Sequence, residues 1–176
     1  VRLVEDSLEG IRPLADEKGS ELRLVAPGGY FEADADARRL RRILQNLLGN
    51  AVDHGEGRPV VVYVDSDADA VAIAVRDFGI GMNPEELERV FDRFWRADPS
   101  RQRSTGGTGL GLAIATEDAH LHGGTLDVWS VEGEGSCFRL TLPRRPGQPV
   151  TGSPIELPPV DPLDAALAEG TGGPDA

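Results

Sequence analysis

Length, composition and charge restrict what this chain can be. At 176 residues and 39% hydrophobic content, it can bury the core of one ordinary domain, and a second domain is not required. The net charge of −12 argues against a broad nucleic-acid or anionic-membrane surface, and the single Cys137 excludes an internal disulfide and a cysteine-built metal site. No apolar run approaches the span of a bilayer and no signal sequence opens the chain, so we expect a soluble segment.

Helical and strand-like patterns alternate along the chain. In chain order they predict a helix over Glu5 to Lys18, a hairpin of Glu21 to Val25 with Tyr30 to Ala33, a helix from Asp34 or Asp36 to His54, strands Pro59 to Ser66 and Ala70 to Asp77, a helix over Pro84 to Phe94, a helix over Leu110 to His122, and strands Thr125 to Ser130 and Ser136 to Leu142. Gly19 is the expected stop of the first helix, and Asn83 followed by Pro84 is a typical helix start.

This order of elements predicts the fold class. Helices alternate with strands that look antiparallel, so we expect an α+β protein, a two-layer α/β sandwich with helices on one face of a mixed, mostly antiparallel sheet. The polar, glycine-bearing stretch 97–108 has no apolar periodicity and is expected to be a mobile lid. Residues 1–143 would form the domain. Residues 144–176, rich in proline, glycine and acidic residues, would form a disordered tail.

Two glycine-rich segments are the strongest chemical signals. Asp77 follows the strand-like run that ends at Val75 and begins a turn with Gly79 and Gly81, whose bare backbone could accept a flat ring. The Asp77 carboxylate could then accept a hydrogen bond from an exocyclic amine such as that of adenine. The second segment, 106–112, leads into an apolar run, so its free N–H groups would lie at a helix N-terminus, which favours phosphate.

An asparagine pair precedes both glycine segments. Asn46 and Asn50 are four residues apart on a predicted helix and therefore share a face, where their amide oxygens suit a magnesium ion that already carries phosphate oxygens. Each signal alone has a plainer interpretation: a turn, a tight contact between helix and strand, or surface asparagines. The conjunction, in this order, indicates a nucleotide site. Its local cations would be Arg93, Arg96, Arg101 and Arg103.

These motifs resemble the catalytic, ATP-binding domain of bacterial sensor histidine kinases, in the wider family of gyrase B, Hsp90 and MutL. Asn46 and Asn50 match the N box of that family, Asp77 to Gly81 its first glycine box, Phe91 to Arg96 its F box, and Gly107 to Gly111 its second glycine box. The resemblance implies the Bergerat-type ATP-binding fold over about the first four-fifths of the chain. Residues 94–101 and 117–122 further resemble actinobacterial sensor kinases of the MtrB type.

The resemblance also implies a set of site residues. The residues expected to bind ATP are Asn46, Asn50, His54, Asp77, Gly79, Ile80, Gly81, Met82, Trp95, Arg96, Gly107, Thr108, Gly109, Leu110 and Gly111. Asn50 would bind Mg²⁺, and Asn46 and Arg96 would act in catalysis. Two readings stay open. His54 could reach the nucleotide or only the terminal carbonyls of its helix, and Phe91, Phe94 and Trp95 could be core residues or could hold the lid over the nucleotide.

Two functional classes follow from this resemblance. One is a kinase, in which bound MgATP is presented to a histidine that attacks the γ-phosphate. The other is an ATP-gated clamp of the Hsp90 or MutL kind, whose general base is a glutamate at the position that Asn46 occupies here. Because an amide cannot take a proton from water, we expect weak hydrolysis and favour the kinase.

None of the three histidines, His54, His120 and His122, has the sequence context of a phosphoacceptor. We therefore expect the acceptor to lie on a separate dimerisation domain of the same sensor kinase, in a longer and membrane-anchored protein whose cytoplasmic part includes this domain. A cognate response regulator would follow in the phosphorelay of this two-component system. The fragment itself is expected to be monomeric and not to bind nucleic acid.

Overall fold

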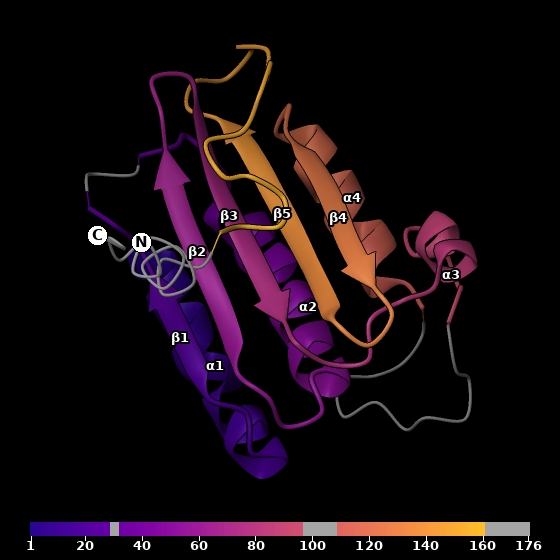
Figure 1. Ribbon diagram of the computed structural model, residues 1–176. Coiled ribbons are helices and arrows are strands. Elements are labelled where there is room, and N and C mark those ends of the chain that lie inside the picture. The colour runs from indigo at the N-terminus through magenta and orange to yellow at the C-terminus, as the bar shows by residue number, and fades with distance from the viewer. Residues whose placement is uncertain (29–31, 97–108, 161–176) are drawn as a thin grey trace, which may run out of the picture.

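The computed structural model describes residues 1–28, 32–96 and 109–160 as a five-stranded sheet with helices (Figure 1). The elements in chain order are α1 (Arg2–Lys18), β1 (Leu22–Val25), α2 (Ala37–His54), β2 (Val60–Ser66), β3 (Ala70–Asp77), α3 (Pro84–Arg89), α4 (Gly111–Leu121), β4 (Thr125–Val131) and β5 (Gly135–Pro143). The described ranges contain no helix with the length and apolar content needed to cross a membrane.

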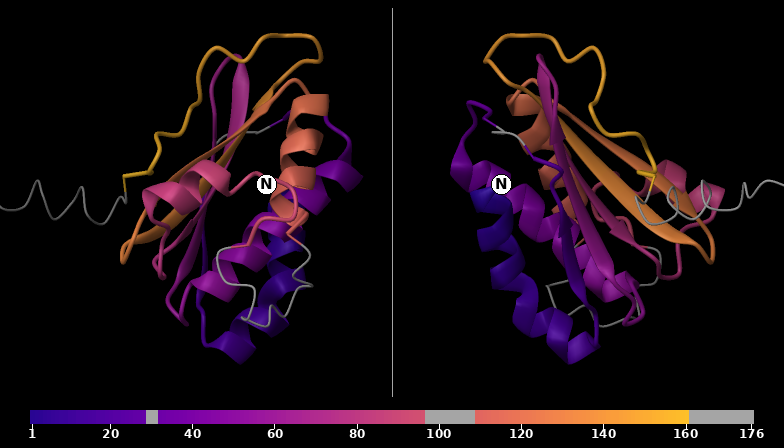
Figure 2. Two further views of the ribbon diagram at one scale, coloured as in Figure 1. Left: turned by 90° about the vertical axis from the view of Figure 1, so that its right-hand side faces the viewer. Right: turned by 60° about the vertical axis from the view of Figure 1, so that its left-hand side comes forward.

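The sheet is mixed, with the strand order β1-β2-β3-β5-β4. Only the pairing of β1 with β2 is parallel, and the other three pairings are antiparallel. Helices α1, α2 and α4 cover one face of the sheet, while α3 lies beyond its β4 edge (Figures 1 and 2). The predicted two-layer sandwich with helices on one face is therefore confirmed.

The predicted hairpin at β1 is wrong within the described residues. Glu32 and Ala33 belong to no strand, and Leu22 pairs in parallel with Val60 instead; Tyr30 and Phe31 lie outside the described residues. Parallel neighbours need a long crossover connection, and α2 supplies it between β1 and β2. The alternating pattern of the first strand was identified correctly, whereas its partner depends on contacts far away in the sequence.

Helix ends follow local signals. Gly19 ends α1 with φ +74°, and Asp36 begins α2 by accepting hydrogen bonds from the N–H groups of Arg38 and Arg39. Asn83 begins α3 with a complete capping box to Glu86, but this helix ends at Arg89 rather than at Phe94. Phe94 has a φ of +63°, a left-handed conformation that a helix cannot contain.

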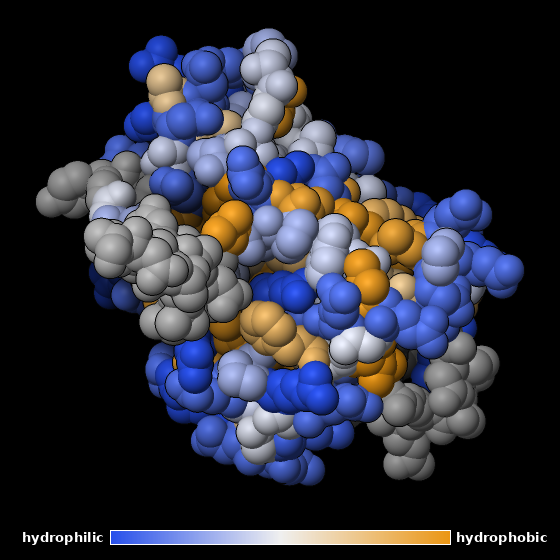
Figure 3. Space-filling model, viewed as in Figure 1, coloured by the Kyte–Doolittle hydropathy of each residue, from blue (hydrophilic) through white to orange (hydrophobic). Residues whose placement is uncertain are grey.

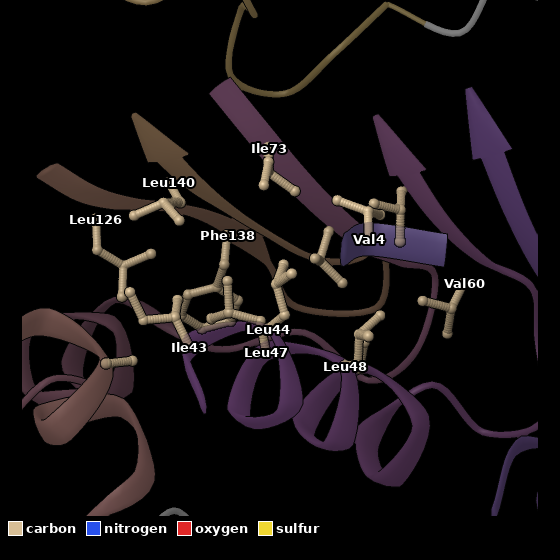
Figure 4. Close-up of a cluster of buried hydrophobic side chains, with 14 of the residues drawn as sticks. Val4, Ile43, Leu44, Leu47, Leu48, Val60, Ile73, Leu126, Phe138 and Leu140 are labelled. Atoms are coloured by element: carbon tan, nitrogen blue, oxygen red, sulfur yellow. The ribbon is translucent and has the colours of Figure 1, made fainter. Parts of the chain in front are cut away.

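The main core lies between the sheet and the helices. The buried apolar face of α2, formed by Ile43, Leu44, Leu47 and Leu48, points at side chains such as Val60, Ile73, Phe138 and Leu140 of the sheet (Figure 4). Spacings of three and four residues place these four on one stripe of the helix, which explains why the sequence folds with this face inward.

An ion-pair cluster fixes α4 against α2. The Asp118 side chain is only 2% exposed; it accepts hydrogen bonds from Nε and Nη2 of Arg42, at 2.7 and 2.6 Å, and from Nη1 of Arg39 at 3.0 Å. The Arg42 guanidinium lowers the pKa of this carboxyl below its usual value. At the same end, His122 Nε2 accepts a hydrogen bond from Asp36 N–H at 3.0 Å, so the start of α2 and the end of α4 are joined.

The region after β5 differs from the expected disordered tail. The structure describes residues 144–160, which run along the side of the sheet opposite the helices (Figure 2), and Ile155 is buried there. Proline and glycine prevent regular structure in this segment, but they do not prevent an apolar side chain from docking. Residues 161–176, for which the same expectation was made, lie outside the described residues.

Candidate functional site: a pocket between α2, α4 and the sheet

One pocket brings the sequence motifs together. It is lined by Gln45, Asn46, Asn50 and His54 of α2, by Asp77, Ile80, Gly81 and Met82 after β3, by Glu86, Val90 and Trp95 of the following segment, by Gly109, Gly111 and Leu112 at the start of α4, and by Ser136 and Phe138 of β5. Segments far apart in the sequence thus line a single pocket, to which they contribute a carboxylate and a pair of asparagines.

The α2 side chains reach the pocket because of helix periodicity. Asn46, Asn50 and His54 follow at intervals of four residues and lie on one face, beside the buried stripe of the helix. Asn46 lies directly against the start of α4, since a β-carbon added at Gly111 would fall 2.9 Å from Asn46 Oδ1. The first asparagine therefore contacts the second glycine segment.

Asp77 is a buried carboxylate in the pocket wall. Its residue is 3% exposed, and the carboxylate accepts hydrogen bonds from the backbone N–H groups of Gly79, at 3.0 Å, and Ser136. Burial raises the pKa of Asp77 to about 6, although those two hydrogen bonds and the charge of Arg76 oppose the shift. Because burial disfavours the charged form of this carboxylate, a ligand that donates a hydrogen bond to it would stabilise that form.

The first glycine segment needs its glycines because backbone approaches it closely. A β-carbon at Gly79 would fall 1.7 Å from the carbonyl oxygen of His54, and one at Gly81, where φ is +66°, would fall 2.0 Å from that of Val131. Ile80 N–H donates to the His54 carbonyl at 3.3 Å. The turn after β3 is thus held between the end of α2 and the β4–β5 connection.

The segment 91–96 divides its aromatic residues between the core and the pocket. Phe91 packs edge-to-face on Phe138, with ring centroids 6.1 Å apart, and Trp95 lines the pocket. Phe94 is 71% exposed, and its N–H donates to the carbonyl of Gly109 at 3.0 Å. This contact joins the segment to the second glycine motif at its described end.

Some predicted site residues are placed differently. Leu110 is the residue before α4 and Gly79 supports Asp77, but neither is among the residues that line the pocket. Arg96 follows Trp95 without lining the pocket, and Arg93 pairs with Glu117 of α4. Gly107 and Thr108, the lid 97–108, and Arg101 and Arg103 lie outside the described residues.

Sequence reasoning missed several pocket residues. Ser136 and Phe138 lie on β5, and their alternation with Cys137 shows that they share a face without showing that this face meets the pocket. The Ser136 hydroxyl is 2.8 Å from the Ser130 hydroxyl, which accepts from Met82 N–H at 2.8 Å. Gln45, Glu86, Val90 and Leu112 also line the pocket; Leu112 ends the second glycine-rich segment, and none of the four was among the residues expected to bind ATP.

Comparisons with known proteins identify the family of the chain. Residues 35–146 match the family described as histidine kinase-, DNA gyrase B-, and HSP90-like ATPase. The chain is 52% identical over 157 residues to the sensor histidine kinase MtrB of Mycobacterium tuberculosis. The aligned region covers 89% of this chain and 28% of the relative. The chain therefore spans little more than a quarter of the length of this curated relative.

Solved structures show the same fold. The mycobacterial sensor histidine kinase MprB matches with a TM-score of 0.69 and 29% identity, over 82% of this chain and 94% of that one. Full-length ShkA, solved in complex with AMPPNP, matches with a TM-score of 0.71 and 31% identity, over 83% of this chain and 30% of that one. The chain thus belongs to the family of histidine kinase-, gyrase B- and HSP90-like ATPases, as an ATP-binding catalytic domain of the sensor histidine kinase type.

Proposed function

We propose that this domain binds ATP together with Mg²⁺ in the pocket between α2 and α4 and donates the γ-phosphate to a histidine on the dimerisation domain of the same sensor kinase. The observation that carries the proposal is the arrangement of the pocket, where the buried Asp77 lines the same cavity as Asn46, Asn50 and the start of α4. The ShkA structure with AMPPNP supports a nucleotide in this fold.

Different residues would bind the adenine base and the phosphates. Asp77, which already accepts two backbone hydrogen bonds, would accept a third from the exocyclic amine of adenine, and Ile80 and Met82 would pack on the ring. The free N–H groups at the start of α4 would bind phosphate oxygens, because the helix dipole favours negative charge there. The binding energy would thus orient the γ-phosphate before transfer.

The donor set fits a magnesium ion. Asn50 lies on the pocket wall and Asn46 points at the start of α4, so two neutral, hard amide oxygens are available on the phosphate side of α2. A magnesium ion there would neutralise charge on the phosphates. Asn46 occupies the position at which clamp-type relatives carry a glutamate base; since an amide cannot accept a proton, the domain would hold ATP for transfer rather than hydrolyse it.

Binding is tested by calorimetric titration with ADP. Asp77→Asn should weaken ADP binding by about ten- to a hundredfold, the loss of one charge-assisted hydrogen bond. Asp6→Asn is the matched control, because Asp6 is a half-exposed carboxylate on α1 and should leave the affinity unchanged. Equal ADP affinity in the Asp77 variant and the wild type would remove Asp77 from the site.

Transfer is tested with labelled ATP and magnesium. The chain alone should not become labelled, whereas an acceptor-helix fragment of its parent kinase should acquire acid-labile label. Arg96→Ala should slow this transfer more than it weakens ATP binding, since charge on the moving group must be neutralised by groups already in place; Arg89→Ala, at an exposed ion pair, is the control. Label on the chain alone would point instead to His54, His120 or His122.

A further inference from the structure

Both faces of the central strands are apolar. Val60, Val62 and Val64 of β2 belong to the core under the helices, whereas Val61 and Tyr63 point to the opposite face and are also buried. A sheet with one solvated face alternates apolar and polar residues, and β2 and β3 do not. The face opposite the helices, which we call the outer face, therefore requires a cover.

The chain itself supplies this cover after β5. Ile155, only 6% exposed, completes an apolar cluster on the outer face, and Leu157 packs against it. In Figure 1 the segment crosses in front of the strands, and Figure 3, viewed from the same side, shows hydrophobic residues gathered on this face among hydrophilic ones. The other buried members of the cluster are Val61, Tyr63, Ala72, Ala74 and Cys137.

Polar contacts fix the position of the segment. Arg139 Nη1 donates to the carbonyl oxygen of Ile155 at 2.7 Å, while its Nη2 donates to Asp127 at 3.0 Å. Two residues along the same strand, Thr141 Oγ1 donates to Ser153 Oγ at 3.0 Å. These contacts come from side chains of β5 at alternate positions, so they recognise an extended segment lying across one face of the sheet.

We propose that the outer face is a docking surface for an extended apolar segment and that residues 153–157 of this chain are its reversible occupant, which supports the pocket from behind. Strand β5 joins the two sides: Ser136 and Phe138 line the pocket, while Cys137, Arg139 and Thr141 face the segment. The coupling to the pocket rests on the proposed function, but the docking itself does not.

The single cysteine of the chain provides a probe of this docking. Cys137 lies in the cluster that Ile155 completes and is fully buried, and burial raises the pKa of its thiol to about 12. Such a thiol reacts with an alkylating reagent only when its surroundings open. The rate of Cys137 alkylation therefore measures how often the outer face is uncovered.

The experiment compares Cys137 alkylation by N-ethylmaleimide in the full chain and two variants. Ile155→Asp should raise the rate by about tenfold or more, the factor expected for losing one buried isoleucine. Val160→Asp, at a residue that is 62% exposed, should leave the rate unchanged. Equal rates in wild type and Ile155→Asp would overturn the proposal.

A synthetic peptide of residues 148–160 separates docking from unfolding. Added in excess to the Ile155→Asp variant, the peptide should occupy the vacated face and restore slow alkylation, whereas the same peptide with Ile155→Asp should not. A rate that neither peptide changes would show that the variant had merely unfolded around Cys137 and would overturn the proposed docking surface. Conversion of the wild type to a dimer that exchanges this segment would overturn the assignment of the occupant to the same chain.

The coupling to the pocket is tested with ADP on the wild-type chain. If docking favours nucleotide binding, nucleotide must favour docking by the same factor, so saturating ADP should slow Cys137 alkylation. Calorimetry on the same sample shows whether ADP is bound. Bound ADP with an unchanged alkylation rate would overturn the coupling, whereas a chain that binds no ADP would contradict the proposed function and leave the docking result standing.

Discussion

Asn46 and Gly111 are direct neighbours in the lining of the pocket, because a β-carbon at position 111 would fall 2.9 Å from the Asn46 side-chain oxygen. The contact joins α2 to the first residue of α4, so a larger residue at 111 would have to displace the end of the Asn46 side chain. The close approach of Asn46 to the start of α4 therefore depends on the absence of a side chain at position 111.

Gly111→Ala should weaken ATP binding by about tenfold while changing the free energy of unfolding by less than about 1 kcal/mol. The added methyl group displaces the end of the Asn46 side chain, a small movement for stability but a large one for a ligand site. Gly10→Ala is the control: nothing lies within 4 Å of its added β-carbon on α1, so it should keep ATP affinity and slightly stabilise the helix. Calorimetry and thermal unfolding measure the two quantities, and unchanged affinity in Gly111→Ala would contradict the role of this contact.

Asp77 should make the ligand-free chain less stable as pH rises. Its folded pKa of about 6 exceeds the unfolded value near 3.8, so the folded state holds the proton more tightly; the corresponding stability is present below pH 4 and is lost as pH rises through 6. The shift corresponds to about 3 kcal/mol at most. The free energy of unfolding, measured with denaturant between pH 4 and pH 7.5, should therefore fall more steeply for the wild type than for Asp77→Asn. Parallel curves would mean that burial does not perturb this carboxyl.

Asn50→Ala should abolish the magnesium-dependent part of ATP binding and leave adenosine binding nearly intact. Asn50 lies on the pocket wall, and its amide oxygen is a ligand suited to Mg²⁺. Titrations with ATP in the presence and absence of magnesium measure the difference. Arg41→Ala, at a half-exposed side chain of the same helix, serves as control. Wild-type magnesium dependence in the Asn50 variant would show that this amide does not bind the metal.

Asn46→Glu should increase ATP hydrolysis, by up to about a hundredfold, because it places a general base where the chain has an amide. Asn46→Gln lengthens the side chain by the same amount without providing a proton acceptor and should produce no gain. Steady-state phosphate release measures both variants. Equal rates in the two would show that a carboxylate at position 46 does not reach the attacking water.

Asp118→Asn should destabilise the chain by about 2 to 3 kcal/mol, because it breaks the hydrogen-bonded ion pairs to Arg42 and Arg39. Asp92→Asn, at an ion pair whose two side chains are about 60% exposed, should cost less than about 0.5 kcal/mol. The arginines lower the Asp118 pKa, so its contribution is present above the unfolded value near 3.8 and is lost as pH falls below it. Denaturant unfolding measures how much free energy of unfolding Asp118→Asn removes at pH 7 and at pH 3. The loss should be smaller at pH 3, and an equal loss at the two pH values would contradict the predicted pH dependence.

Local patterns in the sequence were sufficient for most of the elements and for the chemical character of the site. The caps at Asp36 and Asn83 and the stop at Gly19 follow from residues within one helical turn, and the asparagine face of α2 follows from the helix period alone. Asp77 and its glycines could be identified because the turn that they form is contiguous in the chain.

Only the tertiary structure decided which distant surfaces meet. The parallel pairing of β1 with β2, the entry of Ser136 and Phe138 into the pocket, and the docking of Ile155 on the outer face all join residues whose separation in the sequence no local pattern encodes. The continuous apolar runs of β2 and β3 did require that both sheet faces be covered. What covers the outer face depends on long-range packing. The proline-rich segment docks there through the buried side chain of Ile155, and no periodicity in its sequence predicts this contact.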